Sequence, residues 1–339
     1  MPLMPSSRAT LIEVAKLAGT SKTSVSRYFG SERERLTPKL QSQIEQAANT
    51  LGYQPNLMAR GLKGGGSRLL GMLVADIRNP FSVAAVHGVE QAARAHGYSL
   101  IVCNTDNDPE QEQTQLASLA AYQVEGLIIN AAGQPEPQLQ ALMHSGIPLV
   151  LLDREIRQLD AEVIGLDNTQ AIDMALDHLV QQGYRSVLYV SEAPEHASAR
   201  QERLRRFKQQ VKTLGLDNQT LVLSSLDEHS AIPTLTEFTQ RPASAPKAVL
   251  CANGNVTLAM VRSFQHLALT MGSIGLLGID ELEWCELVSP GITTLAQPTD
   301  AIGQAAVACL LNQLPQHAGK LAVQARHSPT LIARGSTIP

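Results

Sequence analysis

The sequence predicts an α/β protein with a small N-terminal helical head, a hinge helix and a two-lobed, doubly wound body. Three observations predict this fold. Helix start and stop signals recur three times within residues 1–55. A glycine-rich joint follows at residues 64–67. From residue 69 onward, short apolar runs alternate with amphipathic stretches in two successive series, which is typical of parallel sheets covered by helices on both faces.

Each of the three helices expected in the head begins at a residue that can cap it. Thr10 and Glu13 have the spacing of a capping box, and the first helix should end at Gly19. Ser21 opens a second helix after a very short turn, which predicts a helix-turn-helix. Thr37-Pro38 opens the third helix. The residues expected to share one small core are Ala15, Leu17, Ala18, Val25, Leu40, Ile44, Ala47 and Leu51.

The head is basic, whereas the rest of the chain is acidic. Residues 1–68 hold ten Lys or Arg and four Glu, a net charge of +6, so the overall net charge of −4 leaves −10 on the remaining residues. A small basic head on a large acidic body indicates a polyanionic partner for the head. The alternative is a chance bias of surface charge.

The second helix of a helix-turn-helix enters the major groove of DNA, where its first residues contact base edges. Lys22 and Thr23 lie at the exposed start of that helix, and Arg27 lies about one turn further on. An arginine at this place can reach the O6 and N7 atoms of a guanine. The alternative is a three-helix module that binds another protein. Short donors suited to phosphates are present at Ser21, Ser24 and Ser26.

Two stretches of the head resemble the LacI/GalR family of repressors. They are residues 10–27, TLIEVAKLAGTSKTSVSR, and residues 51–62, LGYQPNLMARGL. The resemblance extends over the whole chain. It implies that the segment after Pro55-Asn56 folds into a hinge helix on operator DNA, where Leu62 wedges into the minor groove and unstacks a base step. The small side chain of Ala59 would let two hinge helices approach each other closely.

The residues expected to contact DNA come from the second helix, its flanks and the hinge. For Leu62 the alternative is a buried linker residue. The chain departs from the family pattern at Phe29-Gly30, where Asn or Val-Asn is usual, and in the strongly charged loop of residues 31–36. These departures concern the loop and not the helices of the head. The expected DNA-binding residues are Thr10, Ser21, Lys22, Thr23, Ser26, Arg27, Asn56, Ala59 and Leu62.

The body is expected to form two lobes that enclose a cleft at the carboxyl ends of their strands. This arrangement resembles the periplasmic sugar-binding fold, which the family uses as its effector domain. A final helix near residues 299–314 should return to the first lobe. The expected domains are residues 1–55 for DNA binding, 56–67 for the hinge and linker, and 68–339 for effector binding and dimerisation. Within the last domain, the N-lobe covers about 68–166 and 299–327, and the C-lobe about 167–298 and 328–335.

Polar residues follow the apolar strands of the body where a cleft would open. Asp153, Asn253 and Asp280 each come directly after a strand, and Arg203 lies early in a helix. The resemblance implies that these positions hold the effector, and that the loop around Phe81-Ser82 covers it. The alternatives are helix caps for the two aspartates, a surface position for Arg203 and core packing for Trp284. The expected effector-binding residues are Phe81, Ser82, Asp153, Arg203, Asn253, Asp280 and Trp284.

Several arginines near the expected cleft favour an anionic effector, because a guanidinium pairs with a carboxylate through two hydrogen bonds. The segment 284–298 also resembles that of family members that respond to gluconate or ketogluconate. We therefore expect a sugar or sugar acid, such as gluconate or 2-ketogluconate. The arginines concerned are Arg154, Arg157, Arg200 and Arg203.

Other function classes find little support in the sequence. There is no GxSxG, HExxH or Walker motif, so an enzyme is not expected, and neither is a cofactor or a metal. Four dispersed cysteines are expected to be buried thiols. The start of the chain lacks a signal-peptide pattern, and no apolar run could span a bilayer, which favours a cytoplasmic, nucleoid-associated protein without membrane contact.

The expected partners are operator DNA, a small effector and a second copy of the chain. The alternatives are a periplasmic-type sugar-binding protein and an architectural DNA protein without an effector.

Overall fold

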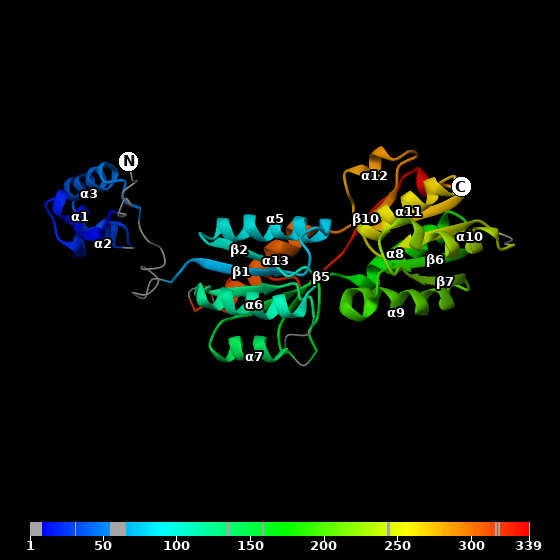
Figure 1. Cartoon of the computed structure of the whole chain (residues 1–339), viewed down its shortest axis with the longest axis horizontal. Coiled ribbons are helices and arrows are strands. Elements are labelled where there is room, and N and C mark those ends of the chain that lie inside the picture. Colours follow the sequence, from blue (N-terminus) through cyan, green and yellow to red (C-terminus); the bar gives the residue numbers. More distant parts are fainter. Residues whose placement is uncertain are drawn as a thin grey trace, which may run out of the picture. The chain divides into compact units, whose positions relative to one another are not determined.

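The structure, a computed structural model, describes residues 9–30, 32–54, 66–133, 136–157, 159–242, 245–315, 317 and 319–338. By its internal contacts the chain divides into two compact units, residues 1–67 and 68–339 (Figure 1). The first unit is helical. The second is built on two six-stranded sheets, which confirms the expected doubly wound α/β body.

The head contains three α-helices, each with the cap that the sequence predicts. Both halves of the capping box at Thr10 and Glu13 are formed. The side chains of Ser21 and Thr37 accept hydrogen bonds from the backbone of the next two helices. The elements are α1 (Leu11–Leu17), α2 (Lys22–Tyr28), the 3-10 helix η1 (Arg33–Arg35) and α3 (Pro38–Thr50).

The core of the head differs in part from the expected set. Leu17 is 53% exposed and Leu51 is 36% exposed, so including them was wrong. In α1 the buried face is formed by residues 14, 15 and 18, which lie on one side at helical spacing, and Leu17 points away from that side. Leu40 packs at the edge of the core. The buried residues are Val14, Ala15, Ala18, Val25, Tyr28, Leu36, Ile44, Ala47 and Ala48.

The first sheet of the body is entirely parallel, with strand order β11-β5-β4-β3-β1-β2. Helices α5 (Pro80–Ala95) and α13 (Thr299–Asn312) cover one face, and α6 (Pro109–Ala121) and α7 (Glu136–His144) cover the other. The final helix therefore returns to the first lobe, as expected. The strands are β1 (Leu69–Val74), β2 (Ser99–Asn104), β3 (Gly126–Ile129), β4 (Leu149–Leu152), β5 (Val163–Leu166) and β11 (Arg326–His327).

The second sheet has the order β12-β10-β9-β8-β6-β7 and is parallel except for β12, which is antiparallel to β10. One face packs on α8 (Asn168–Gln181) and α9 (Ser198–Thr213), and the other on α10 (Ile232–Gln240), α11 (Gly254–His266) and α12 (Trp284–Leu287). The strands are β6 (Ser186–Ser191), β7 (Asp217–Val222), β8 (Lys247–Cys251), β9 (Ile274–Ile279), β10 (Thr293–Ala296) and β12 (Thr330–Ile332); short 3-10 turns are η3 (Pro194–His196), η4 (Glu228–Ser230) and η5 (Gly335–Thr337).

The chain passes between the two sheets three times: after β5, after β10 and between β11 and β12. Each lobe is therefore completed by segments that lie far apart in the sequence. Because both sheets are parallel over most of their strands, the loops after β4, β6, β8, β9 and β10 gather at strand carboxyl ends, where α/β proteins bind ligands. Polar side chains in these loops form the site described next.

Candidate functional site

Helix α2 presents its start and its Arg27 to solvent. Lys22 and Thr23 are exposed in the first turn, and no acidic residue lies there to offset the charge of Lys22. The Arg27 Nε donates a hydrogen bond to the Glu32 Oε2 at 3.2 Å, and the same carboxylate pairs with Arg35. Among the described residues no partner engages the two Nη groups of Arg27. They remain available for a second, bidentate contact, such as one to a guanine edge.

The other residues expected to bind DNA take different positions. Thr10 and Ser21 use their hydroxyl groups to cap α1 and α2, and Ser26 is half-buried on α2. A capping hydroxyl lies at the helix N-terminus, beside backbone N–H groups that suit a phosphate. Asn56, Ala59 and Leu62 lie outside the described residues.

The body contains a group of buried polar side chains around the segment 252–254, which joins β8 to α11. We call it the polar group. Arg203, only 4% exposed, donates from Nη1 to the Ala252 carbonyl at 2.6 Å and from Nε to the Asn168 Oδ1 at 2.7 Å. Arg203 thus faces the carboxyl end of β8 from α9. It is not a surface residue of its basic cluster.

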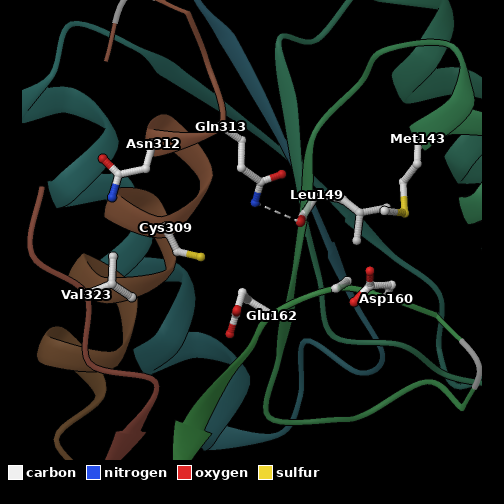
Figure 2. A pocket seen from close by; sticks show the side chains of 9 residues that line it. Met143, Leu149, Asp160, Glu162, Cys309, Asn312, Gln313 and Val323 are labelled. Carbon is white, nitrogen blue, oxygen red and sulfur yellow. Dashed lines mark hydrogen bonds between the residues drawn. The ribbon is translucent and has the colours of Figure 1, made fainter. Parts of the chain in front are cut away.

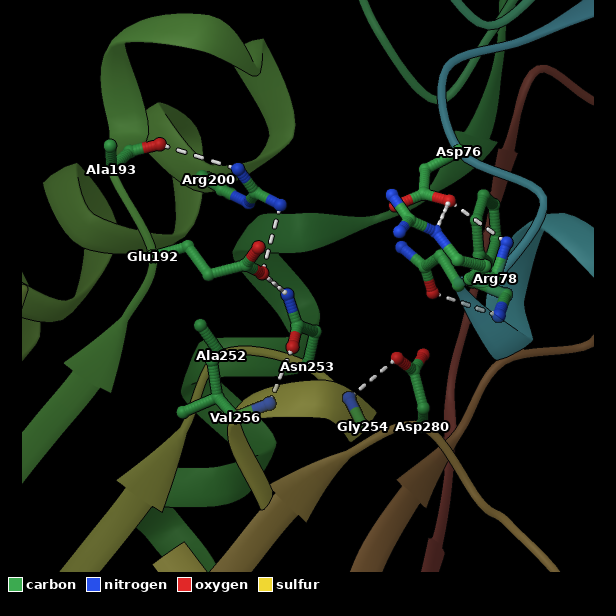
Figure 3. Close-up of polar contacts among 12 residues, drawn as sticks. Asp76, Arg78, Glu192, Ala193, Arg200, Ala252, Asn253, Gly254, Val256 and Asp280 are labelled. Carbon is green, nitrogen blue, oxygen red and sulfur yellow. Dashed lines mark hydrogen bonds and ion pairs between the residues drawn. The ribbon is translucent and has the colours of Figure 1, made fainter. Parts of the chain in front are cut away.

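Asn253 lies within this segment, and Asp280 binds the segment from the end of the neighbouring strand β9. The Asn253 Oδ1 caps α11 at the Val256 N–H, and its Nδ2 donates to the Glu192 Oε2 at 2.6 Å (Figure 3). The Asp280 Oδ2 accepts from the Gly254 N–H at 2.9 Å, and its Oδ1 accepts from the Gln297 Nε2 at 2.6 Å. Asp280 has φ +83°, a left-handed backbone that is uncommon outside glycine.

The first lobe contributes Asp153 and Arg154 to this group. Asp153 also has a left-handed backbone, with φ +63°. Arg154 is buried and donates from Nη1 to the Ala131 carbonyl at 2.6 Å. Burial raises the pKa of the Asp153 carboxyl, while the charges of Arg203 and Arg154 oppose that shift and the charge of Asp280 adds to it. Residues from both lobes therefore share one electrostatic environment.

Buried polar atoms without a hydrogen-bond partner concentrate here. Of the eight such side-chain atoms in the described part of the chain, five lie in these loops and strands. Burial raises the pKa of the Tyr189 hydroxyl, and the charges of Arg203 and Arg200 oppose that shift. Tyr189 therefore lies close to these arginines and belongs to the group. Each unsatisfied group costs about 1–3 kcal/mol, so a polar ligand that bonded them would be strongly favoured. The five are Asp153 Oδ1, Arg154 Nε, Tyr189 OH, Ser191 Oγ and Gln297 Oε1.

Comparison with known proteins places this arrangement in a family. Residues 67–327 match the family of periplasmic binding proteins and sugar binding domain of LacI family, and residues 10–56 match the bacterial regulatory proteins of the lacI family. The chain is 46% identical over 334 residues to the HTH-type transcriptional regulator PtxS of Pseudomonas aeruginosa, covering 98% of this chain and 96% of that protein. The chain belongs to the LacI family.

Two further comparisons concern a regulator similar in sequence and a solved structure of the same fold. The HTH-type transcriptional regulator KdgR of Bacillus subtilis is 36% identical, covering 90% of this chain and 91% of that protein. The crystal structure of the lac repressor dimer bound to operator and the anti-inducer ONPF superposes with a TM-score of 0.83, at 24% identity, over 98% of this chain and 100% of that one. The chain is therefore a DNA-binding transcription regulator with a sugar-binding domain, as expected, and not an enzyme. A sugar-binding protein without a DNA function is not favoured.

Three of the residues expected at the effector site lie among apolar neighbours. Phe81 and Ser82 are nearly buried in the first turn of α5, which Asn79 caps. Trp284 is half-buried and packs on the core beneath α11. Among the described residues no hydrogen bond joins Trp284 to Arg203 or Asn253, and its packing against the apolar core is in keeping with core packing.

Sequence reasoning did not include several residues of this polar group. Glu192 and Gln297 directly follow β6 and β10, and Asn168 follows β5 by one residue, so the strand-end rule that selected Asn253 could have found them. Tyr189 gave no such signal, because it lies inside an apolar strand.

Two cavities lined by described residues lie elsewhere. One of about 430 Å³ lies in the first lobe between α13 and the strand β4, where the Gln313 Nε2 bonds the Leu149 carbonyl at 3.2 Å (Figure 2). Asp160 and Glu162 line it at the amino end of β5, away from the strand ends that hold the polar group. The polar group around Asn253, and not this cavity, matches the position where α/β folds bind ligands. Among the described residues no helix is long and apolar enough to cross a membrane.

Proposed function

We propose that this LacI-family regulator binds a sugar acid, such as gluconate or 2-ketogluconate, in the cleft around Asn253, and that this effector controls its affinity for operator DNA. The observation that carries the proposal is a pair of buried cations. Arg154 and Arg203 are 8% and 4% exposed, yet among the described residues neither forms a hydrogen-bonded ion pair with a carboxylate. Buried charges are normally paired, so an anionic ligand would stabilise both guanidinium groups.

The polar groups of such a ligand would find matching partners. Asp280 and Asp153 supply acceptors for its hydroxyl groups, and Asn253 supplies an amide donor for an oxygen of its carboxylate. Phe81 and Ser82 stay proposed as the cover from the first lobe, and Trp284 as a stacking surface. A mixture of carboxylate-binding arginines and hydroxyl-binding aspartates favours a sugar acid over a neutral sugar.

The proposed division of labour follows the domain boundaries expected from the sequence. Residues 1–55 bind DNA, residues 56–67 form the hinge and linker, and residues 68–339 bind effector and pair with a second copy of the chain. A homodimer would match operator half-sites related by two-fold symmetry. Such a protein works in the cytoplasm at the nucleoid. The proposed DNA contacts are Thr10, Ser21, Lys22, Thr23, Ser26, Arg27, Asn56, Ala59 and Leu62.

The effector is proposed to release the operator, as in a catabolic repressor. It would do so by favouring one arrangement of the lobes, with a coupling of about 1–3 kcal/mol, or roughly 5–150-fold in operator affinity.

Calorimetric titration tests the effector. Gluconate, 2-ketogluconate and a neutral hexose are titrated into the wild type, Asp280→Ala and Asp177→Ala. The exposed Asp177 on α8 serves as the charge-matched control. The sugar acids should bind the wild type and the control, and Asp280→Ala should lose binding together with the operator response. Tight binding of neutral sugars or purines alone would overturn the proposal, and a normal response of Asp280→Ala would remove that residue from the site.

A further inference from the structure

One carboxylate of the protein already occupies the donors that a sugar acid would use. Glu192 follows β6, and its Oε2 accepts hydrogen bonds from the Asn253 Nδ2 at 2.6 Å and from the Arg200 Nη2 at 2.8 Å (Figure 3). The Arg200 and Glu192 side chains are 16% and 22% exposed, so the pair lies at the edge of the buried group. The Glu192 charge also acts on Arg154, which belongs to the other lobe.

Each of the two donor residues is also held by a second hydrogen bond. Asn253 caps α11 through its Oδ1, and Arg200 also donates from Nη1 to the Ala193 carbonyl at 3.3 Å. The Nδ2 group and the Nη2 group both point to one oxygen, which is the arrangement that holds a ligand carboxylate. Glu192 stands where such a ligand oxygen would be bound.

We propose that Glu192 is a built-in competitor, whose carboxylate must be displaced from Arg200 and Asn253 by the carboxylate of the effector. The inference rests on the proposed sugar-acid effector. Exchange of one carboxylate for another keeps both donors satisfied before and after binding, so the exchange itself is nearly balanced. The Glu192 side chain, which lies at the edge of the buried group, can turn to water when displaced. Glu192 then sets the effector concentration at which the regulator responds.

A neutral sugar has no carboxylate that could replace that of Glu192, and its hydroxyl groups form weaker neutral hydrogen bonds, so it would bind with the Glu192–Arg200 pair intact. Glu192 therefore affects the two ligand classes differently. Removing its charge should favour sugar acids and leave neutral sugars unchanged.

The test compares both ends of the ion pair. Calorimetric titrations with gluconate, 2-ketogluconate and glucose are carried out on the full chain as wild type, Glu192→Gln, Arg200→Gln and Glu195→Gln. Glu195 is exposed in η3, and among the described residues no partner bonds its carboxylate, so its variant controls for the loss of one negative charge. Thermal unfolding confirms that each variant is folded.

Glu192→Gln should bind the sugar acid roughly tenfold more tightly, since a charge-assisted contact is worth about that factor. Arg200→Gln should bind it more weakly, and Glu195→Gln should match the wild type. Opposite effects of the two substitutions on sugar-acid affinity support competition. If the ion pair were purely structural, both substitutions would weaken binding. If the wild type binds the sugar acid but Glu192→Gln binds it no more tightly, the inference is overturned and the proposed effector stands. Failure of the wild type to bind any sugar acid would overturn the proposed effector and this inference with it.

Discussion

The Arg27–Glu32 pair decides how the long arginine side chain of α2 is presented. Because Glu32 engages Nε, it orients the guanidinium and leaves the Nη fork open. An exposed pair of this kind contributes at most about 1 kcal/mol, but fixing one geometry can still matter for discrimination between bases, where a bidentate contact is worth about 1–3 kcal/mol.

Glu32→Gln should therefore lower the ratio of operator to random-DNA affinity by about two- to fivefold, the equivalent of such an exposed pair. Glu34→Gln, in the same loop, removes the same charge without touching Arg27 and is the control. Both variants should bind random DNA more tightly, because each removes a negative charge facing a polyanion. Fluorescence anisotropy with a selected operator and a scrambled duplex measures the ratio. Equal ratios for the two variants would contradict orientation of Arg27 by Glu32.

Asp153 gives a prediction about pH. Burial raises the pKa of its carboxyl, so the folded protein holds a proton there more tightly than the unfolded chain does. Stability linked to this group is complete below its ordinary pKa and is lost as pH rises through the raised value. Asp153→Asn cannot ionise, so it should unfold at a higher Tm than the wild type at neutral pH, with a gain that shrinks as the pH is lowered. The exposed Asp177→Asn should show no such gain, and a lower Tm for Asp153→Asn at neutral pH would refute the argument.

At the scale of elements, α5 and α13 cross at two glycines. A β-carbon on Gly303 would lie 2.5 Å from the backbone nitrogen of Val89, and one on Gly88 would lie 2.8 Å from the Thr299 carbonyl oxygen. Both neighbours are backbone atoms, which cannot turn aside as a flexible side chain can. The close crossing lets α13, contributed from near the end of the chain, complete the first lobe.

Gly303→Ala should therefore destabilise the protein although alanine favours helix. Overpacking of a rigid contact costs about 1–3 kcal/mol, which outweighs a gain of about 1 kcal/mol in helix propensity. Gln304→Ala, on the exposed side of the same helix, serves as the control and should be close to neutral. Urea unfolding gives both free energies, and a Gly303→Ala variant as stable as the wild type would show that the helices can separate at little cost.

Helices and strands could be predicted from the sequence where local capping and apolar patterns mark their ends. They could not be predicted as well where contacts between distant segments set those ends. The caps at Thr10, Ser21 and Thr37 are local hydrogen bonds, so the helices of the head were placed correctly. The edge strand β7 begins at Asp217 with polar residues that carry no apolar pattern, because pairing with β6 supports them. In the cleft, strand ends pointed to Asn253 and Asp280, whereas the buried state of Arg154 and the Glu192 contact depend on segments that meet only in the fold.

At the scale of the whole molecule, the head and the body carry opposite net charge, and DNA and effector act on different parts. If the effector weakens operator binding by some factor, operator must weaken effector binding by the same factor. We expect that factor to lie at roughly 5–150. Titrations of 2-ketogluconate in the presence and absence of saturating operator measure it. Identical effector affinities in the two titrations would contradict coupling between head and body.

The three passages of the chain between the sheets have a consequence for how the protein is made. Synthesis proceeds from the N-terminus, and domains generally fold as they emerge from the ribosome. The head, residues 1–67, is a separate compact unit and is available early. The first lobe, by contrast, needs α13 and β11, which emerge only with residues 299–327. A nascent chain thus carries its DNA-binding head long before its effector-binding domain is complete. A chain truncated before residue 299 would keep the head but would lack effector control.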